Sequence, residues 1–174
     1  VWSCGINHHG QLARATSTSI ESANVAVCPE LSDIVKISCG SNFSLFLKRD
    51  GTVLSCGENN IGQLCRNLDP GISYHYRPVV IPNLYDVVSI ATGASSSFFV
   101  RGNGTVMSGG NNYYSQLCRE AISASNLKLN FDSIPDLVSV VDIFAGENST
   151  FILKGDGTLL SSGQNNTWSL GGDV

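Results

Sequence analysis

A block of about 53 residues recurs in register along this chain of 174 residues, and this repeat constrains the fold more than any other feature. The same residue type returns three times at matched positions. The matched sets are Pro29, Pro82 and Pro135; Gly40, Gly93 and Gly146; and Gly51, Gly104 and Gly157. Repeats of about this length are typical of solenoids, propellers and arrays, in which each unit buries its apolar face against a neighbour. We therefore look for function on surfaces that the repeats share.

The repeat predicts one continuous array over residues 1–174. Its units are expected at 1–28, which is partial, and at 29–81, 82–134 and 135–174. The first segment matches only the tail of a unit, because its Gly, Asn and Gln precede the corresponding residues of the next unit by 52 positions. These pairs are Gly5 and Gly57, Asn7 and Asn59, and Gln11 and Gln63.

Each unit carries the pattern of β-strands. Val35, Ile37 and Cys39 alternate with polar residues, which predicts a half-buried strand with these apolar side chains inward. The pairs Val88 and Ile90, and Val141 and Ile143, are expected to do the same. A second apolar run then leads to Asp-Gly or Asn-Gly at 50–51, 103–104 and 156–157, which predicts a β-hairpin in each unit. The fold class is all-β.

Three segments differ between the copies while the frame around them is kept. They cover residues 13–28, 65–81 and 118–134. We interpret them as loops with a short outer strand or turn, and as the parts that distinguish this protein from others with the same frame.

The run G-x-N-x-x-G-Q-L, preceded by D-G-x-[VL]-x-x-x-G, resembles the repeat of the regulator of chromosome condensation family. The resemblance covers nearly the whole chain. It implies a β-propeller of seven four-stranded blades, of which about three full repeats plus partial ends are present. An arc of this size would expose two blade faces, so we expect the chain to be part of a longer one. Assembly of several short chains into a ring is the alternative.

The chain departs from the family pattern at several positions. The His that usually follows the first Gly is absent, and the Gly that usually follows Gln-Leu is Ala13, Cys65 or Cys118. In the third loop, Tyr113 and Tyr114 are followed by Ser115, where a Gly is expected. These substitutions leave the repeat frame intact.

The two variable positions inside each G-x-N-x-x-G-Q-L loop are the first candidates for binding a partner. The repeat predicts that they lie on one rim of the propeller, where tyrosines would offer large amphipathic contacts. These residues are His8, His9, Asn60, Ile61, Tyr113, Tyr114 and Asn166, with Trp168 nearby. The alternative is that the two tyrosines pack between blades.

A second candidate cluster lies in the variable segment before Pro78. It consists of Tyr74, His75, Tyr76 and Arg77, and combines aromatic and cationic side chains. The alternative is a loop that packs on its own blade.

No pattern of catalytic, cofactor-binding or metal-ligating residues stands out. The three histidines share no acid or base at repeated positions, and GENNIGQL lacks the Lys and Ser/Thr of a phosphate-binding loop. The six cysteines include no C-x-x-C pair, and Cys4 and Cys56 share one repeat position while Cys65 and Cys118 share another. We interpret them as reduced, small core residues rather than as a zinc site.

The charge balance bears on partners. Ten basic residues against 14 acidic ones give a net charge of −4, and the basic residues, such as Arg14, Arg66 and Arg101, look scattered along the chain. This charge pattern does not indicate a nucleic-acid-binding surface. The sequence also has no apolar run long enough to predict a membrane-spanning segment.

The sequence therefore favours a non-catalytic protein-interaction propeller that acts as a scaffold or adaptor within a larger chain or complex. The resemblance implies an alternative, a guanine-nucleotide exchange factor for a small Ran-like GTPase. A third interpretation is a propeller that regulates or targets a ubiquitin ligase, a ciliary complex or a cytoskeletal complex. The expected location is intracellular, in the cytoplasm or on cytoskeletal or ciliary structures rather than on chromatin.

Overall fold

A computed structural model describes residues 1–14, 21–66, 72–119, 131–166 and 170–171. Within these ranges the chain forms β-strands and no helix, so no helix could span a membrane there. The strands are β1 (Trp2–Ile6), β2 (Glu21–Val27), β3 (Ile34–Cys39), β4 (Phe43–Lys48), β5 (Val53–Glu58), β6 (Tyr74–Val80), β7 (Val87–Thr92), β8 (Ser96–Arg101), β9 (Val106–Gly110), β10 (Asp132–Ser133), β11 (Val140–Ala145), β12 (Ser149–Lys154) and β13 (Leu159–Gly163).

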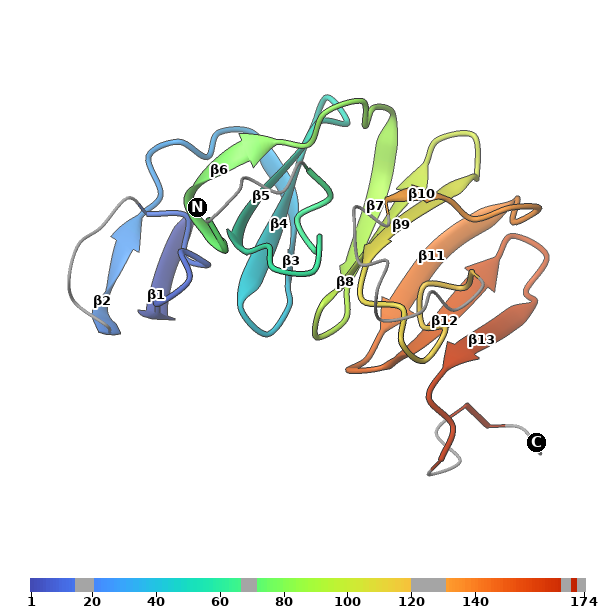
Figure 1. The fold of residues 1–174 in the computed structure, drawn as a ribbon. Helices are drawn as coiled ribbons and strands as arrows, with labels where there is room; N and C mark the ends of the chain where they lie inside the picture. The colour runs from blue at the N-terminus through green and yellow to red at the C-terminus, as the bar shows by residue number, and fades with distance from the viewer. Residues whose placement is uncertain (15–20, 67–71, 120–130, 167–169, 172–174) are drawn as a thin grey trace.

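The strands form four antiparallel sheets that follow one another as an arc (Figure 1). We call them blades 1 to 4, made of β1–β2, β3–β6, β7–β10 and β11–β13. The two middle blades have four strands each, paired in chain order. The first strands of blades 2, 3 and 4 lie side by side, because β7 contacts both β3 and β11. The unit boundaries expected near residues 28, 81 and 134 remain a prediction.

The Asp-Gly and Asn-Gly dipeptides close hairpins, as the sequence predicted. Gly51, Gly104 and Gly157 have φ values of 82°, 77° and 85°, which a glycine adopts without steric cost. The Asp or Asn that precedes each glycine accepts a hydrogen bond from the backbone N–H of the Thr that follows the glycine. In the first hairpin, the distance from the Thr52 N to the Asp50 Oδ1 is 3.0 Å. This bond holds the pKa of the Asp50 carboxyl below its ordinary value.

Burial alternates along β3, but Val35, Ile37 and Cys39 are its exposed residues, so the expectation that they point inward is wrong; in β7 and β11 the alternation itself is interrupted. The register shifts between Ile34 and Lys36, and again at the two equivalent places in β7 and β11. The extra residue at each shift is an exposed valine: Val35, Val88 or Val141. Beyond the shift, Ile90 and Ile143 are buried, whereas their counterpart Ile37 is exposed. The bulge leaves one residue unpaired in all three strands, so it does not cause this difference. Ile37 lines a hollow beside blade 1, which has only two described strands, whereas Ile90 packs against blade 2.

The apolar core lies between the blades. One buried cluster joins Val53 and Phe43 of blade 2 to Leu84 and Ile90 of blade 3, and a second joins Phe98 of blade 3 to blade 4. A smaller cluster joins blade 1 to blade 2. The stacking that the repeat predicted therefore supplies the burial.

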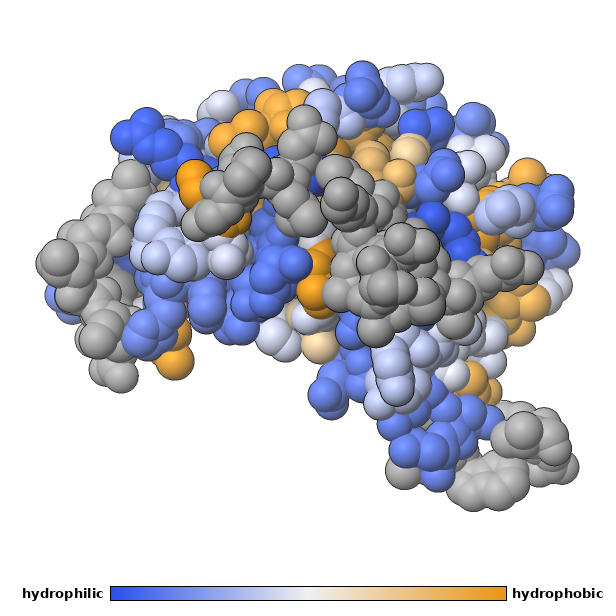
Figure 2. Space-filling view, viewed as in Figure 1, coloured by the Kyte–Doolittle hydropathy of each residue, from blue (hydrophilic) through white to orange (hydrophobic). Residues whose placement is uncertain are grey.

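The outer blades expose residues that the inner blades bury. Val53 and Val106 are fully buried, but Leu159 at the same position of blade 4 is 60% exposed. Exposed apolar residues form several separate groups on the face viewed in Figure 2 rather than one continuous patch. Blade 1 has only two described strands, so Cys4 of β1 is exposed while its counterpart Cys56 is fully buried. The expectation that Cys4 is a core residue is wrong for this reason.

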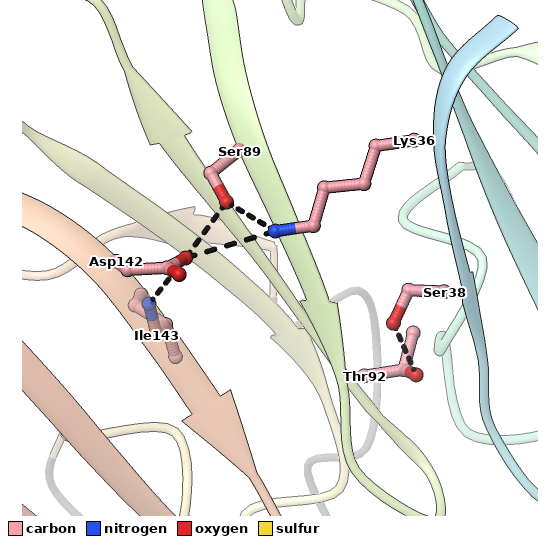
Figure 3. A network of polar contacts seen from close by, with 6 residues as sticks. All are labelled: Lys36, Ser38, Ser89, Thr92, Asp142 and Ile143. Atoms are coloured by element: carbon pink, nitrogen blue, oxygen red, sulfur yellow. Dashed lines mark hydrogen bonds and ion pairs between the residues drawn. The ribbon is translucent and has the colours of Figure 1, made fainter.

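Polar side chains connect the innermost strands (Figure 3). The Lys36 Nζ donates to the Ser89 Oγ at 2.8 Å, and the Ser89 Oγ donates to the Asp142 Oδ1 at 2.9 Å. Lys36 and Asp142 also form an ion pair with an N–O distance of 3.7 Å. These residues occupy one repeat position in three consecutive blades, so they link blades 2, 3 and 4.

Candidate functional site

The G-x-N-x-x-G-Q-L loops follow the same strand of each blade, and one asparagine organises each of them. The Asn59 Oδ1 accepts a hydrogen bond from the Leu64 N at 3.0 Å, and the Asn59 Nδ2 donates to the Arg66 O at 3.5 Å. Asn7, Asn112 and Asn165 accept the same bond from Leu12, Leu117 and Leu170. The asparagine therefore fixes the loop backbone while the two variable residues project from it.

The glutamine of the motif connects adjacent blades. Its backbone oxygen accepts a hydrogen bond from a hydroxyl group in the next blade: Ser97 donates to Gln63 at 2.7 Å and Thr150 donates to Gln116 at 2.8 Å. Ser44 donates to Gln11 in the same way. The repeated motif thus both shapes the loop and locks one blade to the next.

The backbone conformation of the residue after Gln-Leu explains why a glycine is usual at that position. Ala13, Cys65 and Cys118 have φ values of 54°, 53° and 57°, in the left-handed region that favours glycine. Ser115 has a φ of 60°, where the equivalent Gly10 and Gly62 have 84° and 80°. The departures from the family pattern therefore keep the backbone conformation at some steric cost.

The loops share one edge of the arc with the turns between the first two strands of each blade. The Ser41 N donates to the Ala94 O at 3.0 Å, and the Ala94 N donates to the Glu147 O at 3.4 Å. We call this edge, with its loops at 7–14, 59–66, 111–119 and 164–166, the loop rim. The Asp-Gly and Asn-Gly hairpins lie on the opposite edge, which we call the hairpin rim.

Tyr113 and Tyr114 are exposed on the loop rim. Their exposed fractions are 67% and 39%, and their rings meet edge to face with centroids 4.9 Å apart. The Tyr113 N donates to the Asn111 Oδ1, and the Tyr114 N donates to the Gln116 Oε1. The two tyrosines therefore do not pack between blades, and their backbone is held in place.

The structure brings together two candidate groups that lie far apart in the sequence. The His9 ring meets the Tyr74 ring at 6.1 Å, and the Tyr74 ring meets the Tyr76 ring at 5.4 Å, both edge to face. The Tyr76 hydroxyl donates to the His8 O at 3.4 Å. The first loop of blade 1 therefore packs on β6 of blade 2, and we call His9, Tyr74 and Tyr76 the aromatic junction.

The remaining candidates are more dispersed. Asn60 is exposed and Ile61 is half-buried on the second loop, and Asn166 is exposed on the fourth. Arg77 extends into solvent and pairs with Glu30 at 3.5 Å, while His75 is half-buried on β6. Trp168 lies outside the described residues.

The cysteine side chains differ in exposure. All six are free; Cys28, Cys56 and Cys65 are buried, whereas Cys4 and Cys39 are exposed. Burial raises the pKa of the Cys56 thiol to about 12 and that of the Cys118 thiol to about 11. Buried thiols of this kind stay protonated and unreactive at neutral pH. The described part of the chain contains no group of three or more potential metal ligands.

Sequence reasoning missed an ordered set of arginines. Arg14, Arg66 and Arg119 occupy one repeat position, so the description of the basic residues as scattered is wrong for these three. They point inward: Arg66 is 8% exposed, and Arg119 donates to the Ser108 Oγ and O. Burial lowers the pKa of the Arg119 guanidinium. Their spacing of about 53 residues was the signal that could have revealed the set.

These features define a β-propeller repeat protein, in which stacked blades display unlike loops from one rim. The chain belongs to the family described as the regulator of chromosome condensation (RCC1) repeat, whose pattern matches residues 1–47 and 50–100, with a further match at 34–63.

Similar proteins with this repeat have different activities. The chain is 33% identical over 114 residues to the secretion-regulating guanine nucleotide exchange factor of Bos taurus, covering 62% of this chain and 23% of that protein. It is 32% identical to the probable E3 ubiquitin-protein ligase HERC6 of Homo sapiens, covering 79% of this chain and 14% of that protein.

The crystal structure of Prp20p from Saccharomyces cerevisiae is similar over nearly the whole chain. It superposes with a TM-score of 0.82 at 28% identity, covering 99% of this chain and 42% of Prp20p. That structure is described together with the binding of Prp20p to Gsp1p and histones. The chain thus spans less than half the length of each of these proteins.

Proposed function

We propose that this chain is a non-catalytic scaffold or adaptor that binds a partner protein on its loop rim. The observation that carries the proposal is the exposed pair Tyr113 and Tyr114 on a loop whose backbone is fixed by Asn111 and Gln116. Tyrosines are frequent at the centre of protein interfaces because they give large contact areas at a small entropic cost. A rigid frame with unlike loops suits selective binding.

The second candidate function is guanine-nucleotide exchange on a small GTPase. It is favoured by the similarity to a secretion-regulating exchange factor and by the Gsp1p binding stated for Prp20p. In both cases the partner is a protein, so the two candidates differ in what binding does to that partner.

The test compares the full-length protein with its Tyr113→Ala, Tyr114→Ala double variant in quantitative affinity capture. The control is Tyr85→Ala, because Tyr85 is also 67% exposed but lies next to the hairpin rim, where the Arg101 Cζ is 4.9 Å from the centroid of its ring. We expect the double variant to lose most of the captured partner and the control to keep it. Equal recovery from all three proteins would disprove binding through the tyrosine pair.

Nucleotide exchange is tested separately with a purified Ran-like GTPase loaded with fluorescent GDP. The scaffold function predicts that the protein leaves the rate of nucleotide release unchanged. Acceleration of release, together with tighter binding to the nucleotide-free GTPase, would instead establish the second candidate.

A further inference from the structure

The aromatic junction presents three rings in a fixed arrangement. The Tyr74 ring stands nearly perpendicular to both of its neighbours, with interplanar angles of 77° to His9 and 76° to Tyr76. The rings come from two blades, and their backbones are in close contact: a Cβ added to Gly10 would lie 2.5 Å from the Tyr76 Cα. This packing holds the rings in place, while Tyr74 remains 44% exposed.

A carboxylate lies beside this junction. Glu58 is directly opposite Tyr74 in the pairing of β5 with β6, so the two side chains project from the same face of the sheet. The Asn42 Nδ2 donates to the Glu58 Oε2 at 3.2 Å, and the Asn60 Nδ2 donates to the Oε1 at 2.9 Å. Both donors are neutral amides, so they orient the carboxylate and leave its charge in place.

The arginines of the first two rim loops and of β6 are directed elsewhere. Arg66 is buried, and the Arg14 Nε and Nη2 atoms are buried as well. Arg77 of β6 pairs with Glu30. Glu58 therefore presents its carboxylate next to Tyr74, its partner across the pair of β5 and β6.

We propose that the aromatic junction and Glu58 bind a lysine or arginine side chain of a partner protein. Aromatic faces attract cations, and a carboxylate forms charge-assisted hydrogen bonds with ammonium and guanidinium groups. The junction lies on the same rim as Tyr113 and Tyr114, so this inference rests on the proposed function and adds the chemistry of the partner. A partner would place a basic segment across blades 1 and 2 and an adjoining surface on the tyrosine pair.

The first experiment measures fluorescence anisotropy of a labelled peptide in which arginine alternates with glycine and serine. The full-length protein is compared with its Glu58→Gln and Tyr74→Leu variants. We expect each substitution to weaken binding by about threefold to tenfold, and we expect the affinity to fall with added salt. A peptide with glutamate in place of arginine is expected not to bind.

The matched control for charge is Asp50→Asn. It removes one negative charge from the hairpin rim, and Asn103 already occupies the equivalent turn with the same hydrogen bond to the following Thr. We expect this variant to bind the arginine peptide as the unmodified protein does. Equal weakening by Asp50→Asn and Glu58→Gln would show non-specific attraction to the net negative charge and would overturn the inference, as would no weakening by Glu58→Gln. Thermal melting of every variant verifies that it is folded.

The two proposals fail differently. If Glu58→Gln and Tyr74→Leu leave capture of the partner unchanged while loss of Tyr113 and Tyr114 abolishes it, the rim binds a partner but the cation site is wrong. If the tyrosine pair has no effect but Glu58→Gln weakens both the peptide and the captured partner, the cation site is supported and the tyrosine contact is wrong.

Discussion

One asparagine in each loop, buried in the first three loops, determines the backbone on which the candidate binding residues are displayed. Asn59 is 1% exposed, and its side chain satisfies the Leu64 N–H and the Arg66 carbonyl. An unsatisfied buried N–H is costly, because it loses its hydrogen bond to water without gaining another. The Asn of the family motif is therefore a structural residue, and the residues that follow it are free to vary.

The substitution Asn59→Ala tests this assignment. We expect it to lower the free energy of unfolding by about 1–3 kcal/mol, because the Leu64 N–H stays buried without an acceptor. The control is His8→Ala, because His8 is the exposed residue that follows the equivalent Asn7 in the first loop, and we expect a change within about 0.5 kcal/mol. Urea unfolding monitored by circular dichroism measures both. Similar values for the two variants would contradict a structural role for Asn59.

The innermost strands are linked by polar side chains as well as by the apolar core. Lys36 of β3, Ser89 of β7 and Asp142 of β11 form one chain of contacts across three blades. Ser38 and Thr92 add a hydroxyl contact of 2.8 Å between β3 and β7. Because these side chains have specific partners, they favour one alignment of neighbouring blades over others.

A double-mutant cycle of Lys36→Met and Asp142→Asn measures this link. We expect a coupling free energy of about 0.5 kcal/mol at low salt, because both side chains are partly exposed and water screens the pair. The coupling should decrease in 1 M NaCl and should remain detectable although the two residues belong to different blades. Zero coupling at low salt would mean that the contact does not contribute to alignment.

The strands and hairpins could be predicted from the sequence because their signals are local. Asp50-Gly51 predicts its turn without reference to any other unit. The bulge at Val35 and its two equivalents could not be predicted, since both the alternating and the bulged strand fit the same apolar residues. The contact between His9 and Tyr74 joins positions 65 residues apart, and only the packing of blade 1 on blade 2 reveals it. Local patterns therefore predicted the candidate residues but not their grouping.

At the scale of the whole molecule, burial depends on a neighbouring blade rather than on the residue itself. Val106 is fully buried by blade 4, whereas Leu159 at the same repeat position is 60% exposed. We therefore expect Val106→Ala to lower the free energy of unfolding of this 174-residue chain by about 2 kcal/mol. Leu159→Ala, although it removes a larger side chain, should change it by less than about 0.5 kcal/mol. Urea unfolding of the two variants measures the difference. Equal destabilisation would mean that Leu159 is covered in solution, for example by a second copy, and a change in oligomeric state with protein concentration would identify that case.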